Sequence, residues 1–184
     1  MDTKSLMIHT ATALFQQKGY KTVGLNEILK ACNVTKGALY HHFPNGKEEL
    51  LIACLNGLKE TITAEIETII RGHKSTKEAT QAILDKLIYN LETEGTITGY
   101  TFSSIVSEMA TVSEPVRRAC SALYENIQHI YAAKLVTDGF SSESASDLAL
   151  MLTASIEGAM MLCLTQKSTD PLKTIAKRLP HLFE

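Results

Sequence analysis

The sequence predicts an all-α protein, and three observations lead to this prediction. Apolar residues recur at spacings of three and four along most of the 184 residues, which is the period of a helix that buries one face. Short breaks rich in Gly, Asn and Pro separate these segments, and no stretch has the alternating pattern of a strand. Hydrophobic residues make up 45% of the chain and only four prolines occur, so we expect a packed core.

The first expected helix covers residues 4–18. Asp2 or Thr3 can cap its N-terminus with a side-chain oxygen, and Gly19 is a natural stop. Its apolar residues form one stripe, so this helix is expected to pack behind the two helices that follow.

The next stretch predicts a helix-turn-helix unit. One short helix is expected over residues 26–32, with Asn26 as its cap, and it ends where Asn33 can adopt the left-handed conformation. Thr35 can cap a second helix over residues 36–42. Two helices of about two turns each, joined by a three-to-four-residue turn, have the form of this unit.

The rest of the chain predicts a helical body. A turn at residues 44–46 leads into a helix over 47–71, which at 1.5 Å per residue is a rod of about 37 Å. Further helices are expected over residues 76–94, over 100–111, to about 138 after Ser113 as its cap, and from 141–144 to about 166. A last helix is expected after Asp170 as its cap, with Pro171 as its first residue. We therefore divide the chain into a head, residues 1–46, and a body, residues 47–184.

Charge is distributed unevenly between these two parts. Residues 1–47 contain six lysines and only two carboxylates, Asp2 and Glu27, whereas the remaining residues are acidic on balance. A basic head on an acidic body suits a protein that presents one end to a polyanion, although ordinary surface variation gives the same pattern.

The second helix of the unit has the composition of a recognition helix. Lys36, Gly37, Tyr40 and His41 are expected to be exposed, with Leu39 partly exposed. Lys, Tyr and His side chains donate to phosphate oxygens, Lys also reads guanine edges, and a small residue lets the backbone approach a ligand closely. The alternative is that Tyr40 and His41 only pack against the protein.

Within about the first 55 residues, the run T-K-G-A-L-Y-H-H-F followed by K-E-E-L resembles the TetR family of transcriptional repressors. The turn P-N-G between these runs is similar to a branch of that family containing regulators of multidrug-efflux genes. Val23 stands where the family often has a phosphate-contacting Thr, so the neighbouring Thr22 is the candidate instead. The resemblance implies DNA contacts by Thr22, Thr35, Lys36, Gly37, Leu39, Tyr40, His41 and Lys47.

The resemblance also implies a homodimer that binds a near-palindromic double-stranded DNA operator and is released by a small apolar or aromatic effector. In this family the last two helices commonly form the dimer interface, and residues 141–182 have a composition suited to it. The alternatives are an activator, a regulator without an effector, or a helical carrier of apolar ligands.

Glu157 is the most informative residue of the predicted body. It is the only charged residue between Asp147 and Lys167, and a buried carboxylate needs a partner or a proton. It is expected to form a hydrogen bond in helix packing or at the dimer interface, to lie in a ligand cavity, or to be solvated at an exposed position. The other candidate ligand-binding residues, for each of which plain core packing is the favoured alternative, are Phe102, Met109, Tyr124, His129 and Met161.

The sequence contains no motif for catalysis, a metal or a cofactor. The adjacent His41 and His42 point about 100° apart on a helix and are poorly placed to chelate one ion. Four widely spaced cysteines without a C-x-x-C pair indicate reduced thiols in the cytoplasm. The longest apolar stretch, residues 148–164, is shorter than the roughly 20 residues of a membrane span, so we interpret it as a buried helix.

Overall fold

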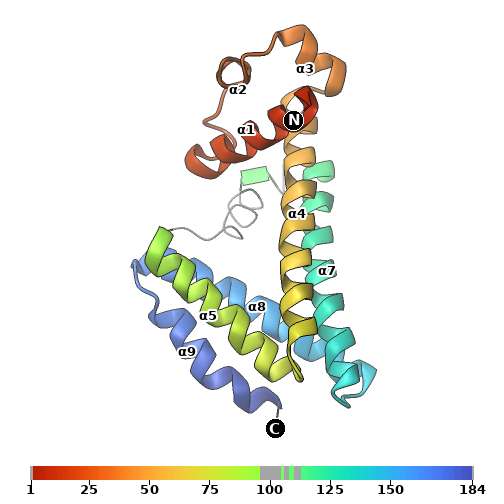
Figure 1. The fold of residues 1–184 in the computed structure, drawn as a ribbon, viewed down its shortest axis with the longest axis vertical. Helices are drawn as coiled ribbons and strands as arrows, with labels where there is room; N and C mark the ends of the chain where they lie inside the picture. The colour runs from red at the N-terminus through yellow and green to blue at the C-terminus, as the bar shows by residue number, and fades with distance from the viewer. Residues whose placement is uncertain (1, 96–104, 106–107, 110–112, 184) are drawn as a thin grey trace. The chain divides into compact units, whose positions relative to one another are not determined.

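A computed structural model describes residues 2–95, 105, 108–109 and 113–183, and all regular structure in these residues is helical (Figure 1). The all-α prediction is thereby confirmed. In chain order the elements are α1 (Thr3–Lys18), α2 (Leu25–Cys32), α3 (Lys36–His42), α4 (Lys47–Gly72), α5 (Thr76–Glu94), α7 (Glu114–Thr137), α8 (Ser142–Gln166), α9 (Asp170–Arg178) and a 3₁₀ turn, η1 (Leu179–Phe183). Of the helix predicted over 100–111, only residues 105, 108 and 109 lie among the described residues, and they are helical.

The helices belong to two compact units. The first consists of residues 1–60 and 101–121, and the second of residues 61–100 and 122–184. Both α4 and α7 begin in the first unit and continue into the second. The predicted division after residue 46 thus stays a prediction about function, while the compact units divide within these two long helices.

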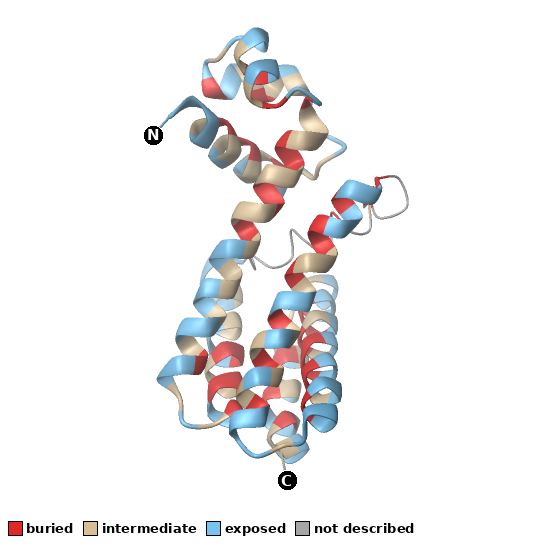
Figure 2. Cartoon of the chain, turned by 90° about the vertical axis from the view of Figure 1, so that its right-hand side faces the viewer, coloured by how far each residue is buried: buried red, intermediate tan, exposed pale blue. Residues whose placement is uncertain are grey.

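The core of the first unit is built by the inner faces of α1 to α4 (Figure 2). Helix α1 packs against α2 and α3, and Phe15, Ile28 and Leu39 are all almost fully buried. Val23 is also fully buried, so its side chain belongs to this core and is not available to a phosphate. Burying a side chain of this size stabilises the fold by about 2 kcal/mol.

Of the caps predicted in the first unit, Asp2, Asn33 and Thr35 are confirmed and Asn26 is wrong. Asp2 accepts a hydrogen bond from the Ser5 N–H at 2.8 Å and caps α1. Asn33 ends α2 in the left-handed conformation, with φ 53°. Asn26 does not cap α2, because the helix begins one residue earlier and Gly24 occupies the cap position.

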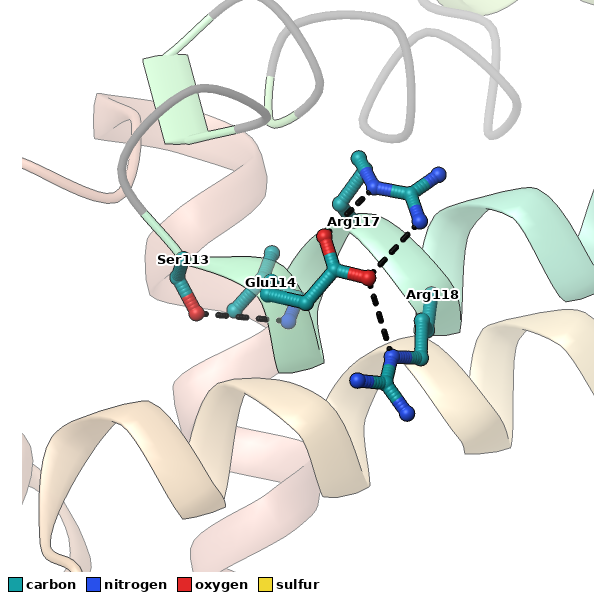
Figure 3. Close-up of polar contacts among 5 residues, drawn as sticks. Ser113, Glu114, Arg117 and Arg118 are labelled. Carbon is teal, nitrogen blue, oxygen red and sulfur yellow. Dashed lines mark hydrogen bonds and ion pairs between the residues drawn. The ribbon is translucent and has the colours of Figure 1, made fainter.

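Helix α7 begins with a cap and a cluster of ion pairs (Figure 3). Ser113 Oγ accepts a hydrogen bond from the Val116 N–H at 3.3 Å, as the sequence predicted for this serine. Glu114 accepts from Arg117 at 2.7 Å and from Arg118 at 3.0 Å. These hydrogen bonds, first that of Arg117 and then that of Arg118, lower the pKa of Glu114 to about 2.

The second unit packs α5, α8 and α9 against one another. Helix α9 begins at Asp170, so Asp170 is its first residue and not its cap, and Thr169 precedes it without a capping bond. Within the described part of the chain, α8 alone has the length and hydropathy of a membrane span. One side of α8, including Leu152 and Ile156, is buried in the unit, which is the behaviour of a core helix.

Candidate nucleic-acid interface and apolar cavity

Three local interactions fix the orientation of α3. Thr35 Oγ1 accepts from the Ala38 N–H at 3.2 Å, so the predicted cap is confirmed. The turn before it is closed by a hydrogen bond from the Val34 N–H to the Leu29 carbonyl at 3.0 Å. Leu39 and Phe43 then anchor α3 in the core of the first unit. The cap, the turn and the two buried side chains therefore determine the rotation of α3 about its own axis.

This rotation exposes a polar face on α3. Thr35, Lys36, Gly37, Tyr40 and His41 are all exposed, and the Lys36 Nζ lies 5.9 Å from the centre of the Tyr40 ring. The face combines a cation, an aromatic hydroxyl, an imidazole and a glycine, which are groups that bind phosphates and base edges.

Our prediction that Leu39 contacts DNA is wrong for this structure. Its side chain is fully buried and lies about 160° around α3 from Gly37, at 100° per residue. The apolar core of the first unit needs a residue at this position, and the sequence pattern did not separate that role from surface contact.

Lys47 is also placed differently from its predicted role at a phosphate. Its Nζ donates to the Tyr20 carbonyl at 2.6 Å and lies 3.9 Å from the centre of the Tyr20 ring. Partial burial lowers the pKa of Lys47, and the negative charge of Glu108 opposes this shift. In this structure Lys47 therefore binds the loop between α1 and α2.

That loop presents two exposed side chains. Thr22, which directly precedes the buried Val23, is exposed. A residue that contacts a phosphate in place of Val23 needs this exposure. Lys21 is exposed as well, and our sequence reasoning missed it. A lysine beside Thr22, in a head rich in lysines, was the signal that could have identified it.

The second unit contains an apolar cavity of about 150 Å³. Residues from α4, α5, α7 and α8 surround it, and most of them are aliphatic. The apolar lining consists of Ile62, Ile66, Ile69, Ile83, Leu87, Leu123, Ile127, Ile156 and Met160. An apolar cavity of this volume holds a ligand of about the size of benzene.

A few polar groups interrupt this wall. Glu157 lines the cavity, and its Oε2 accepts from the Tyr124 hydroxyl at 3.4 Å. Lys86 and Glu65 also line it and form an ion pair at 2.9 Å. Convergent polar groups in an apolar cavity are a common feature of small-molecule sites. Glu157 thus has both features that the sequence left open, a packing partner and a place in a cavity wall.

The other candidate ligand residues are dispersed. Tyr124 contacts Glu157 but does not itself line the cavity, and His129 is exposed. Met161 is 39% exposed, and its neighbour Met160 lines the cavity instead, because one residue along a helix rotates a side chain by about 100°. Met109 is buried in the first unit and does not line this cavity, whose residues belong to the second. Phe102 lies outside the described residues.

Among the described residues, no group of three or more His, Cys, Asp or Glu side chains is placed to hold a metal ion. The ring centres of His41 and His42 lie 5.0 Å apart, in an edge-to-face arrangement.

Comparisons with known proteins connect both units to one class. Residues 7–54 match the family model described as bacterial regulatory proteins, tetR family. Residues 76–178 match the model described as transcriptional regulator LmrA/YxaF-like, C-terminal domain.

Full-length relatives agree with these matches. The uncharacterised HTH-type transcriptional regulator YxaF of Bacillus subtilis is 36% identical over 98% of this chain and 95% of its own length. The HTH-type transcriptional regulator LmrA of the same organism is 35% identical over 100% of this chain and 97% of its own length.

Solved structures share the fold. The reduced form of Escherichia coli NemR superimposes with a TM-score of 0.88 at 23% identity, covering 98% of this chain and 97% of its own. A TetR regulator of Legionella pneumophila gives a TM-score of 0.83 at 22% identity, covering 100% and 98%. The relatives are regulators and not enzymes, and the chain belongs to the TetR family of bacterial transcriptional regulators, with a C-terminal domain of the LmrA/YxaF type.

Proposed function

We propose that the chain is a homodimeric repressor that binds a near-palindromic DNA operator and leaves it when a small apolar or aromatic molecule occupies the cavity. The observation that carries this proposal is the exposed face of α3, in which Lys36, Gly37, Tyr40 and His41 point away from a fully formed core. A short helix held rigidly in this way is suited to enter a major groove.

Lys36 and Tyr40 are the central contacts of the proposed interface. Lys36 has the length to reach either a phosphate or a guanine edge, and the hydroxyl of Tyr40 donates to a phosphate oxygen. Thr35, Gly37 and His41 flank them, while Thr22 and Lys21 add contacts from the loop before α2. A second head related by a two-fold axis would read the other half of the site.

The outer face of α8 supports the homodimer. Its exposed residues form a stripe at helical spacing that is apolar or small, which is costly to leave in water and lets a second helix approach closely. The stripe consists of Leu150, Met151, Ala154, Gly158, Met161 and Leu162. A second copy of this chain is the proposed partner.

The cavity is an argument for a small-molecule effector, whose binding would act on the first unit through α4 and α7. Each of these helices has its first turns in the first unit, while Ile62 and Ile66 of α4 and Leu123 of α7 line the cavity. A ligand that fits the cavity better in one helix arrangement than in another shifts the protein toward that arrangement. DNA and effector then weaken each other's binding by the same factor.

Fluorescence anisotropy tests the proposal directly. The protein is titrated against a duplex from upstream of its own gene and against a scrambled duplex, each at two salt concentrations. We expect tight, salt-sensitive binding to the first duplex only, because neutralising several phosphates releases counterions. Lys36→Ala and Tyr40→Phe should weaken it while the dimer persists. Unchanged affinity in both variants would refute the assigned interface.

A further inference from the structure

A carboxylate from outside the helix-turn-helix contacts the loop that precedes it. Glu108 Oε2 accepts a hydrogen bond from the backbone N–H of Lys21 at 3.1 Å. Gly19, with φ +77°, makes room for this carboxylate, because a Cβ on Gly19 would lie 3.1 Å from Glu108 Oε1. Both features belong to the first unit. The carboxylate therefore lies across the backbone of residues 19–21.

The same loop is held from a second side by α4. Lys47 Nζ donates to the Tyr20 carbonyl at 2.6 Å, and the rings of Tyr20 and Phe15 lie 5.4 Å apart. Val23 is fully buried and ends the loop in the core. Between these fixed points, the side chains of Lys21 and Thr22 remain exposed.

A second hydrogen bond joins the neighbouring residues to α4. Ser113 Oγ donates to Glu48 Oε1 at 3.0 Å, next to Lys47 in the sequence. Glu108 thus contacts the loop between α1 and α2, and Ser113 contacts the first turn of α4.

We propose that Glu108 is a positioning residue for DNA binding, which holds the backbone of Lys21 so that the Lys21 and Thr22 side chains meet the phosphates beside α3. This inference rests on the proposed function, and it adds a residue that lies in no DNA-binding motif. A carboxylate close to a DNA-facing loop repels phosphates, so its electrostatic effect alone would weaken binding. A positioning role predicts the opposite outcome when the side chain is removed.

Two substitutions separate position from charge. Glu108→Ala removes the acceptor and the charge, whereas Glu108→Gln keeps an oxygen that accepts the Lys21 N–H. The probe is a duplex selected by the wild-type protein from a random-sequence library. We expect Glu108→Ala to weaken binding by roughly ten- to a hundredfold for each head, the size of one lost charge-assisted hydrogen bond. The affinity of Glu108→Gln for the duplex should stay within about threefold of the wild-type value, since the hydrogen bond remains.

Hydrogen exchange provides a readout without DNA. The Lys21 amide should exchange faster in Glu108→Ala and regain protection in Glu108→Gln. Glu60→Ala is the matched control, because Glu60 is exposed on α4 and lies about 20 Å along the helix from Lys47. The control should change neither DNA binding nor the exchange of this amide.

Three results would overturn the proposal. A Glu108→Ala variant that keeps the wild-type affinity for DNA would refute it. So would equally increased affinity of Glu108→Ala and Glu108→Gln for both the selected and random duplexes, because that result indicates a purely electrostatic effect. Unchanged exchange at the Lys21 amide would also refute it. If the wild-type protein selects no duplex, the proposed function itself fails, and the exchange result then reports on the hydrogen bond alone.

Discussion

Leu39 provides a sharp test of how the recognition helix is built. It lies one residue before Tyr40, yet its side chain is fully buried whereas Tyr40 is 43% exposed. The two positions should therefore respond to substitution in opposite ways. One should change the free energy of unfolding and the other should change the affinity for DNA.

The magnitude for Leu39→Ala follows from its burial. The substitution removes three carbon atoms from a fully buried site on α3, a helix that packs against α1, and such changes cost about 2–5 kcal/mol. Most of that loss should fall on the first unit, because Leu39 belongs to its core. Tyr40→Phe removes only an exposed hydroxyl, so its stability should stay within roughly 0.5 kcal/mol of the wild type.

Urea unfolding followed by circular dichroism measures both variants, and anisotropy measures their DNA affinity at low temperature. Where most Leu39→Ala heads remain folded, apparent affinity should fall only by the fraction that is unfolded. Tyr40→Phe should lose affinity roughly fivefold at unchanged stability, the value of one hydrogen bond. The reasoning is refuted if Leu39→Ala keeps wild-type stability while its DNA affinity falls.

Three further predictions concern the second unit and the thiols. Met151→Glu with Leu162→Glu should convert the proposed dimer to a folded monomer in sedimentation, because the proposed interface would bury unpaired charge. Benzene should raise the melting temperature of the wild type but not of Ile66→Trp, whose ring fills the cavity. Burial raises the pKa of Cys54 and Cys120 to about 11, from 9.0. At pH 8 alkylation should therefore be about a hundredfold slower in the folded protein than in urea.

Each of these has a clear contrary outcome. A dimer that survives both glutamates would move the interface away from α8. Equal stabilisation of both proteins by benzene would mean that it binds elsewhere. Since a raised thiol pKa stabilises the folded state below about pH 9 and this contribution is lost as the pH rises toward 11, stability that is flat over this range would contradict the two thiol pKa values.

Local chemistry made much of the head predictable from sequence. Caps such as Asp2 and Thr35, and the left-handed Asn33, act within three or four residues, so short patterns contain all the information they need. The exposed character of Lys36 and Gly37 followed from the same helical period. Asn26 failed as a cap because Gly24, two residues earlier, occupies the cap position, an ambiguity that local propensity does not resolve.

Tertiary structure decided which groups several side chains contact. Lys47 is charged and lies at the start of a helix. Its ammonium nevertheless donates a hydrogen bond to the Tyr20 carbonyl, 27 residues earlier in the chain. Glu108 contacts the Lys21 N–H across 87 residues, and no periodic pattern links the two. Met160 rather than Met161 lines the cavity, since the packing of α8 against its neighbours determines its rotation.

The sequence alone therefore determined the helices, most of their ends and the position of the helix-turn-helix, because helical periodicity and capping are short-range effects. The folded chain decided which groups Leu39, Lys47 and Glu108 contact and where the cavity lies. These depend on contacts between residues that lie far apart in the sequence, and only packing in three dimensions brings those residues together.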